Sequence, residues 1–206
     1  MTVRLERADA YRTLLATWSA DADLRGAIRV AAVVFVAALT AAAAQISFPV
    51  PFTTVPFTLQ PMIVLVGGAA LGSRLGMSSQ VVYLIAGLAG LPVFAASPVL
   101  PQGPLRLLGP TGGYLISYPL AAFAAGWLAE RGFDRRYLTS ALAMAAGLAV
   151  IFACGVLWLA WFARPAGVGF SAALATGFYP FIAVDVLKIL LAAMVLPSVW
   201  RFVRPV

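Results

Sequence analysis

Six long stretches of this sequence are apolar and almost free of charge, and they constrain the fold more than any other feature. They cover roughly residues 27–46, 60–73, 76–96, 112–129, 138–163 and 178–199. A helix needs about 20 apolar residues to cross the hydrocarbon core of a bilayer. The stretches therefore predict an all-α membrane protein, a bundle of six transmembrane helices. The second stretch is short for a full crossing, so a count of five stays open.

Composition supports this class, because polar residues are too scarce to cover a water-facing surface. Hydrophobic residues make up 63% of the chain and charged residues 10%, against about 25% charged residues in soluble domains. The absence of histidine excludes a Ser-His-Asp triad and an H-E-x-x-H zinc site. The only lysine, Lys188, follows a leucine, so no G-x-x-x-x-G-K-[ST] phosphate loop exists. We expect no enzyme, no metal site and no ATP-driven transport by this chain alone.

The distribution of arginines predicts the orientation in the membrane. With six spans, one set of helix ends carries only Arg106 and Arg164. The opposite set carries eleven arginines, namely Arg4, Arg7, Arg12, Arg25, Arg29, Arg74, Arg131, Arg135, Arg136, Arg201 and Arg204. The positive-inside rule then places both termini in the cytoplasm of a bacterial plasma (inner) membrane. The net charge of +7 thus reflects topology and not nucleic-acid binding.

Two proline-rich segments, 47–61 and 91–113, are external loops in this topology. They contain four and five prolines, and residues 47–61 carry no charge. Proline fixes φ and removes a backbone donor, so the first segment is predicted to be stiff and non-helical. Its apolar character suits a lid that lies on the protein, with a ligand beneath both segments. The alternative is a pair of plain connectors. We expect a polar cytoplasmic segment over 1–25 and a substrate-binding domain over 26–206.

Asp185 and Lys188 are the only charges deep within an apolar stretch. A charge at the bilayer centre costs about 2.5–3.5 kcal/mol on insertion scales, so two of them need a reason. Their spacing of three places them on one helix face, roughly 7–12 Å below the external end of a helix that starts near Pro180. A carboxylate accepts N–H donors and an ammonium pairs with an anion. The pair suits a small ligand with an N–H face and an acid group; a structural ion pair is the alternative.

Four further residues are candidates for the same site. Arg106 lies in the second proline-rich segment and could pair with a ligand carboxylate, or it could anchor the chain at the interface with its stem reaching to water. Tyr83, Tyr114 and Gln60 could supply ring stacking or hydrogen bonds. Tyrosines near helix ends also form interface belts, so these three stay open between ligand contact and membrane anchoring.

Small residues at a spacing of four predict close helix packing on two stretches. The series Gly68, Gly72 and Gly76 favours packing inside the bundle. On the first stretch the small residues are alanines, and they could pack inside the bundle or dock a partner membrane protein. The alanines are Ala37, Ala38, Ala41 and Ala42.

Four runs of residues, in this order, resemble the BioY family, the biotin-specific substrate-binding (S) components of energy-coupling factor (ECF) transporters. They are Val55–Gln60 (VPFTLQ), Gly87–Ala95 (GLAGLPVFA), Gly109–Leu115 (GPTGGYL) and Asp185–Lys188 (DVLK). The resemblance covers about residues 27–200. The polar segment 1–25 and the prolines around Ser97–Pro104 depart from the family pattern.

The resemblance implies six helices, cytoplasmic ends and a biotin pocket near the external face. It implies that Asp185 faces the ureido ring and Lys188 the valerate carboxylate. It also implies a transmembrane coupling protein and two ATPase subunits as partners, with the alanine face of the first helix as the docking surface. Two alternatives stay open: the same fold with another vitamin, or a structural membrane subunit that binds no ligand.

Overall fold

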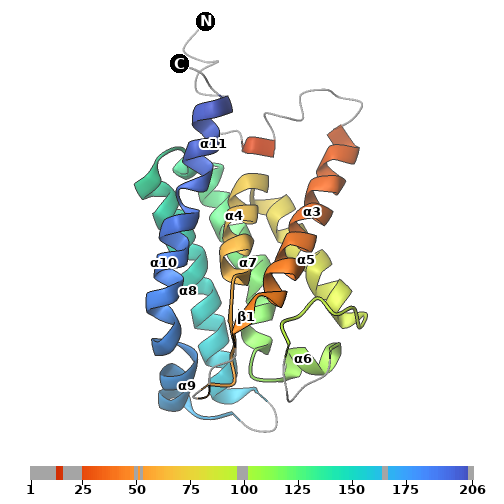
Figure 1. Cartoon of the computed structure of the whole chain (residues 1–206), viewed down its shortest axis with the longest axis vertical. Helices are drawn as coiled ribbons and strands as arrows, with labels where there is room; N and C mark the ends of the chain where they lie inside the picture. The colour runs from red at the N-terminus through yellow and green to blue at the C-terminus, as the bar shows by residue number, and fades with distance from the viewer. Residues whose placement is uncertain are drawn as a thin grey trace, which may run out of the picture.

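The computed structural model describes residues 13–15, 25–48, 51, 53–96, 102–163 and 167–203. The long helices run side by side along one axis (Figure 1). In chain order the elements are α3 (Arg25–Gln45), β1 (Ser47–Phe48), β2 (Phe57–Thr58), α4 (Gln60–Leu71), α5 (Ser73–Leu88), α6 (Pro104–Leu108), α7 (Gly112–Ala129), the short 3-10 helix η1 (Phe133–Arg135), α8 (Tyr137–Trp161), α9 (Phe170–Gly177), α10 (Tyr179–Ala192) and α11 (Val195–Val203).

The two ends of the bundle carry different elements. The first turn of α3 and the helix α11 lie at one end, and α6 and α9 lie at the other (Figure 1). Among the described residues, three helices are long and apolar enough to cross a membrane: Arg25–Gln45, Tyr137–Trp161 and the continuous α10–α11 stretch Tyr179–Phe202. The fold is therefore mostly helical, with outward faces built for lipid.

Four of the expected helices have the expected bounds to within two residues. α7 covers the predicted range 112–129, and α3, α4 and α8 match the predictions over 27–46, 60–73 and 138–163. Pro119 lies inside α7 and does not end it. An uninterrupted apolar run with good helix formers leaves the backbone no other way to satisfy its N–H and C=O groups in lipid.

The predicted helix over residues 76–96 is wrong in its last eight positions, because α5 ends at Leu88. Gly90 adopts a φ of +90°, which favours glycine and ends a right-handed helix. The chain then turns back, and the ring of Phe94 packs closely on Gly87. A β-carbon on Gly87 would lie 2.1 Å from the Phe94 ring. Phe94 also meets Tyr83 edge to face, with ring centroids 5.5 Å apart.

The predicted span over 178–199 is confirmed as one apolar stretch long enough to cross a membrane, Tyr179–Phe202, and a local turn at residues 193–194 divides it into α10 and α11. The cause lies four residues further along the chain. Pro197 has no N–H to donate to the carbonyl of Ala193, and its ring crowds that carbonyl.

The first proline-rich segment is non-helical, as predicted, and part of it forms a short hairpin that was not predicted. Strands β1 and β2 pair antiparallel, with Ser47 opposite Thr58 and Phe48 opposite Phe57. The pairing supplies backbone hydrogen bonds within the proline-rich segment that follows α3. In a helix the same groups would bond along the chain. The second proline-rich segment, expected to be a loop, contains the short helix α6.

Helix α7 forms the centre of the bundle and packs against α8, α4 and α5. Its inward residues are small: Ala121, Ala122 and Ala125 are fully buried. A β-carbon on Gly68 of α4 would lie 2.5 Å from the backbone oxygen of Ala122, and one on Gly76 would lie 2.7 Å from the Cα of Gly68. The predicted role of the glycine series in internal packing is therefore confirmed.

A buried polar contact joins α3 to α5. The side-chain amide of Gln80 donates to Thr40 Oγ1 at 3.2 Å and to Ser79 Oγ at 3.1 Å. Thr40 and Gln80 are both fully buried. Hydrogen bonds between side chains are among the few polar interactions that can join helices in hydrocarbon. This one fixes how α3 is rotated relative to α5.

A second polar contact fixes α11 to the turn between α7 and α8. The indole N–H of Trp200 donates to Asp134 Oδ2 at 2.6 Å, and the guanidinium of Arg135 lies 3.3 Å from the centroid of the Trp200 ring. Asp134 is 1% exposed, and Arg135 Nε lies 3.3 Å from its Oδ1. The pKa of Asp134 is raised because burial removes water from the carboxylate, and the Trp200 and Arg135 contacts offset only part of that effect.

This buried carboxyl predicts a pH dependence of stability. A carboxyl whose pKa rises on folding stabilises the fold most below its unfolded pKa of about 3.9, and this contribution is lost as pH rises through the folded-state pKa. We expect the Tm of the wild type to fall more between about pH 4 and 7 than that of Asp134→Asn, which keeps an acceptor for Trp200. Thermal unfolding in detergent followed by tryptophan fluorescence measures both profiles. Parallel profiles would contradict the assignment.

Candidate ligand-binding site

Asp185 and Lys188 form an ion pair on α10. Lys188 Nζ lies 2.7 Å from Asp185 Oδ1, and Asp185 is 5% exposed. Their spacing of three residues places the two side chains one turn apart on the same face, as predicted. Pro180 sits in the first turn of α10, where its missing N–H leaves no intrahelical bond unmade. The helix therefore starts six residues before Asp185, and the pair lies in its middle.

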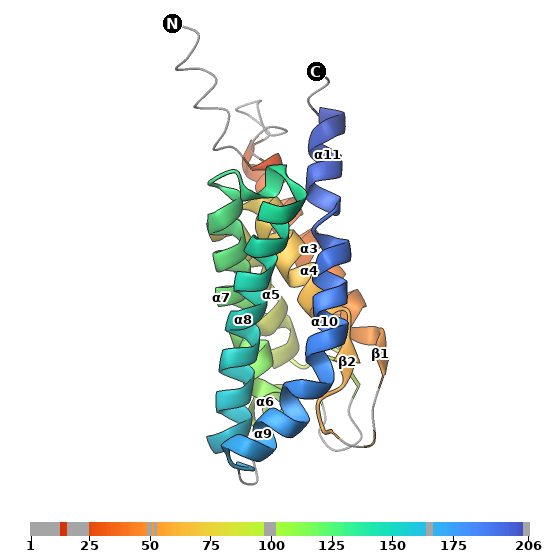
Figure 2. The ribbon, with the colours of Figure 1, turned by 90° about the vertical axis from the view of Figure 1, so that its left-hand side faces the viewer.

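The β1–β2 hairpin closes over this ion pair. Lys188 Nζ also donates to the backbone oxygen of Thr58 at 2.7 Å. The ring of Phe57 stacks on Phe181 of α10 with centroids 4.3 Å apart, and its centroid lies 5.9 Å from Lys188 Nζ. Figure 2 shows β2 beside α10. The described part of the first proline-rich segment thus lies on the protein and contacts the charged pair directly.

A cluster of buried polar side chains lies between α4, α5 and α7. Gln60 Nε2 donates to the Tyr83 hydroxyl at 2.6 Å, and this hydroxyl donates to the Val93 carbonyl at 3.3 Å. The ring of Tyr83 lies 6.4 Å from that of Tyr118, roughly parallel to it. Gln60 and Tyr83 are 3% and 1% exposed. The alternative of a lipid-facing interface belt is therefore wrong for Tyr83.

Arg106 reaches this cluster from α6. Its guanidinium donates to the backbone oxygen of Ala95 and interacts electrostatically with Tyr83. The residue is 4% exposed, which overturns the alternative of an anchor whose head reaches water. The guanidinium therefore adds a buried cation to this part of the protein.

Tyr114 lies at the junction of α7, α8 and α9. Its hydroxyl donates to the Gly177 carbonyl at 2.8 Å, and its ring fills the space over Gly155, where a β-carbon would lie 2.2 Å from it. Tyr114 is 8% exposed, so an interface belt is wrong here too. Its hydroxyl already has a backbone partner, which leaves its ring as the part available to a ligand.

These residues belong to neighbouring elements of the bundle. Tyr114 and Tyr118 lie one turn apart on α7, and the ring of Tyr118 meets that of Tyr83 of α5. We call this set the polar zone; it comprises Gln60, Tyr83, Arg106, Tyr114, Tyr118, Asp185 and Lys188. It combines one carboxylate, one ammonium, one guanidinium and a floor of aromatic rings. Such a zone can bind a small ligand that carries N–H donors, an anionic group and a ring.

Sequence reasoning missed three contributors to this zone. Tyr118 lies one turn after Tyr114 on the same helix, so the spacing of four was a usable signal. Phe57 and the Thr58 carbonyl were missed because their contribution depends on the hairpin that carries them to α10. A backbone carbonyl has no signature in the sequence.

The four alanines proposed for partner docking do not form one surface. Ala37 is 6% exposed and belongs to the hydrophobic core, and Ala41 packs against that core. Both contact this chain's own helices, so they offer less side-chain surface to a partner than the other two alanines do. Ala38 and Ala42 are exposed on the outward side of α3. They lie between the large exposed side chains Val34 and Phe35 on one side and Ile46 on the other.

Long apolar helices and a buried polar zone near one end define the class of this protein, a multi-pass helical membrane protein with a candidate site for a small ligand. A family model described as the BioY family matches residues 15–205. The chain belongs to the BioY family.

Curated relatives support the same assignment. The chain is 44% identical over 158 residues to a probable biotin transporter BioY of Pyrococcus horikoshii, an alignment that covers 77% of this chain and 87% of the relative. It is 37% identical over 147 residues to the biotin transporter BioY of Thermotoga maritima, covering 71% and 81%. Membership in a family of transporters confirms that the chain is not an enzyme.

A solved structure shares the fold. The crystal structure of the S-component for biotin from an ECF-type ABC transporter superposes with a TM-score of 0.77, covering 88% of this chain and 95% of that chain at 22% sequence identity. At this level of identity the likeness establishes the helical arrangement alone.

Proposed function

We propose that this chain is the biotin-binding subunit of an ECF-type uptake system. The observation that carries the proposal is the Asp185–Lys188 pair on α10, buried beside tyrosines in a family whose relatives are named biotin transporters. Biotin presents a cyclic urea with two N–H donors and, at the end of its tail, a carboxylate. The polar zone offers a carboxylate for the first group and two cations for the second.

In the arrangement that the resemblance implies, Asp185 accepts from the ureido N–H and Lys188 pairs with the valerate carboxylate. In the structure their charged atoms lie 2.7 Å apart, whereas the ureido ring and carboxylate lie at opposite ends of biotin. Lys188 must therefore give up its hydrogen bond to the Thr58 carbonyl or to Asp185 in order to bind the valerate carboxylate. The alternative is that Arg106 binds this carboxylate instead. The rings of Tyr83 and Tyr114 are proposed to flank the ligand, with Gln60 holding Tyr83 in place.

The membrane topology is part of the proposal. Six crossings are assigned to α3, α4, α5, α7, α8 and the α10–α11 pair, with the polar zone near the external face. The arginine distribution supports cytoplasmic termini in the plasma membrane, a cytoplasmic segment over 1–25 and the binding domain over 26–206. The proline-rich loops that join the spans then lie outside the cell.

Direct binding tests the proposed ligand. We expect purified protein in detergent to bind biotin with a Kd tighter than about 1 μM in isothermal titration calorimetry. Binding of another vitamin in place of biotin would keep the site and change the ligand. No binding of any vitamin would favour a structural subunit. Uptake of labelled biotin by cells with and without the energising module then tests transport.

The energy for uptake is proposed to come from a transmembrane coupling protein and two ATPase subunits, because this chain lacks a phosphate-binding loop. The outward alanines Ala38 and Ala42 of α3 support docking there, since small residues at a spacing of four allow a partner helix to approach closely.

This docking surface gives a prediction of its own. We expect Ala38→Leu to lower co-purification of the coupling protein by about tenfold, because a larger side chain holds the helices apart. Biotin affinity and Tm should stay unchanged, since Ala38 faces outward. Ala146→Leu, at an exposed alanine of α8, is the matched control. An equal loss of co-purification in Ala38→Leu and Ala146→Leu would contradict docking on α3.

A further inference from the structure

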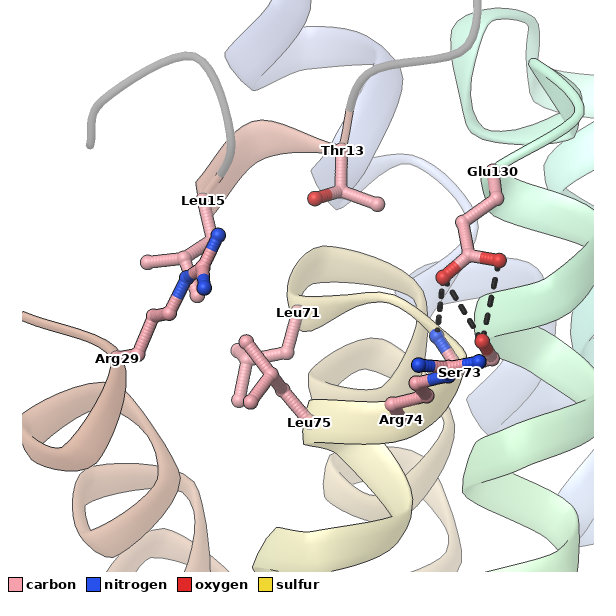
Figure 3. A pocket seen from close by; sticks show the side chains of 8 residues that line it. All are labelled: Thr13, Leu15, Arg29, Leu71, Ser73, Arg74, Leu75 and Glu130. Carbon is pink, nitrogen blue, oxygen red and sulfur yellow. Dashed lines mark hydrogen bonds between the residues drawn. The ribbon is translucent and has the colours of Figure 1, made fainter. Parts of the chain in front are cut away.

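A hollow of about 340 Å³ lies at the end of the bundle away from the polar zone. It sits between the first turns of α3 and the turn that joins α4 to α5 (Figure 3). Leu71 and Leu75 form its floor in that view, and Leu15 lies over it. Arg29 stands on one side and Arg74 on the other. The hollow thus combines an aliphatic floor with two guanidinium groups at its rim.

The one carboxylate in the lining is already engaged. Glu130, just after α7, accepts from the backbone N–H of Ser73 at 2.7 Å and from Ser73 Oγ at 2.8 Å. It covers the turn at Gly72, whose φ of +89° favours glycine. Glu130 therefore caps the start of α5. Both of its carboxylate oxygens accept from Ser73, and the two arginines are the cationic groups of the lining.

Within the part of the chain that the structure describes, the side chains of Arg29 and Arg74 make no hydrogen bond or ion pair with a protein group. Both are exposed at the rim. A guanidinium is suited to a phosphate group, since its planar fork of donors matches two phosphate oxygens. Two of them on opposite sides of one hollow define a site for a singly charged phosphate diester.

We propose that this hollow binds the phosphate of an anionic membrane lipid. The aliphatic floor matches the glycerol and upper acyl carbons and not a fully hydrated free anion. The outward face of α3 continues the apolar path next to Arg29, because Val30 and Val34 are 64% and 52% exposed. A lipid whose phosphate lies between the arginines can therefore extend its chains along α3.

Lipid retention in the purified full-length protein tests the proposal. Protein reconstituted with phosphatidylglycerol is extracted in mild detergent and examined by native mass spectrometry. We expect one retained phosphatidylglycerol, and about 10- to 30-fold less occupancy in the double variant Arg29→Gln/Arg74→Gln. Phosphatidylcholine should not be retained. The matched control is Arg136→Gln/Arg201→Gln, which removes two exposed arginines from the same end and should keep the lipid.

Each contrary outcome overturns the proposal. An equal loss in both double variants would show diffuse surface attraction, and retention of phosphatidylcholine would show that the charge is irrelevant. Displacement of the lipid by millimolar inorganic phosphate would assign the hollow to a soluble anion. Unchanged lipid retention together with reduced co-purification of a partner protein would assign it to that protein. Circular dichroism and size-exclusion profiles identical to wild type establish that the variants are folded.

Discussion

Biotin affinity is expected to fall by about 1–3 kcal/mol, roughly 5- to 150-fold, when Asp185 is replaced by Asn and again when Lys188 is replaced by Ala. Each change removes a charge-assisted hydrogen bond that the ligand would make inside a poorly hydrated zone. The changes also break the 2.7 Å ion pair between them, which leaves the remaining charge buried. Isothermal titration calorimetry on the purified variants gives the Kd, and thermal unfolding gives the Tm.

Two readouts are needed because a purely structural ion pair would also respond. In that case the variants lose Tm and keep their affinity for biotin. Asp134→Asn is the matched control, because it removes a buried carboxylate at the other end of the bundle and should leave the Kd unchanged. Unaltered affinity in both Asp185→Asn and Lys188→Ala would end the assignment of this pair to the ligand.

The second large effect is expected on folding. Replacing Gly126 by Val should lower the free energy of unfolding by about 3 kcal/mol, the upper end of the cost of overpacking. A β-carbon there would lie 2.5 Å from the backbone carbon of Gly72 and 2.5 Å from the backbone nitrogen of Ser73. Backbone atoms cannot rotate away as a side chain can. The helix α7 would have to separate from the α4–α5 turn that it supports.

Thermal unfolding and the yield of monodisperse protein measure this effect. Gly26→Ala is the control, because a β-carbon at Gly26 in α3 would have no neighbour within 4 Å. That variant should be as stable as the wild type or slightly more stable, since alanine favours helix by about 1 kcal/mol over glycine. A Gly126→Val protein as stable as Gly26→Ala would refute the close packing of α7.

The helices with uninterrupted apolar runs could be predicted from the sequence, and those interrupted by turns could not. α7 was predicted to the residue because its inward and outward faces are both apolar. The end of α5 was missed because hydropathy does not show that Gly90 takes a positive φ or that Phe94 folds back onto Gly87. The break before α11 was missed because Pro197 acts on a carbonyl four residues earlier.

Part of the candidate site could be predicted for a related reason. Asp185 and Lys188 stood out because charges in an apolar helix are expensive, and that cost is visible in the sequence. The buried state of Arg106 was not visible, because it depends on α6 folding back toward Ala95. The division of the α3 alanines into inward and outward pairs was likewise hidden, since it depends on how α3 is rotated against its neighbours.

The hydrogen bond between Gln80 and Thr40 has a mechanical consequence. Separating the two helices would break this hydrogen bond where no water can replace it, at a net cost of about 1 kcal/mol, while Gln80 would keep Ser79 and Thr40 would keep the Val36 carbonyl as partners. The helices α3 and α5 therefore form one stiff panel, with Ala38 and Ala42 on its outer surface and Tyr83 on its inner surface. We expect a displacement of the Tyr83 ring by a bound ligand to shift α5 and, through the Gln80–Thr40 contact, α3 with it. The proposed docking surface on α3 would then respond to a ligand that it does not contact.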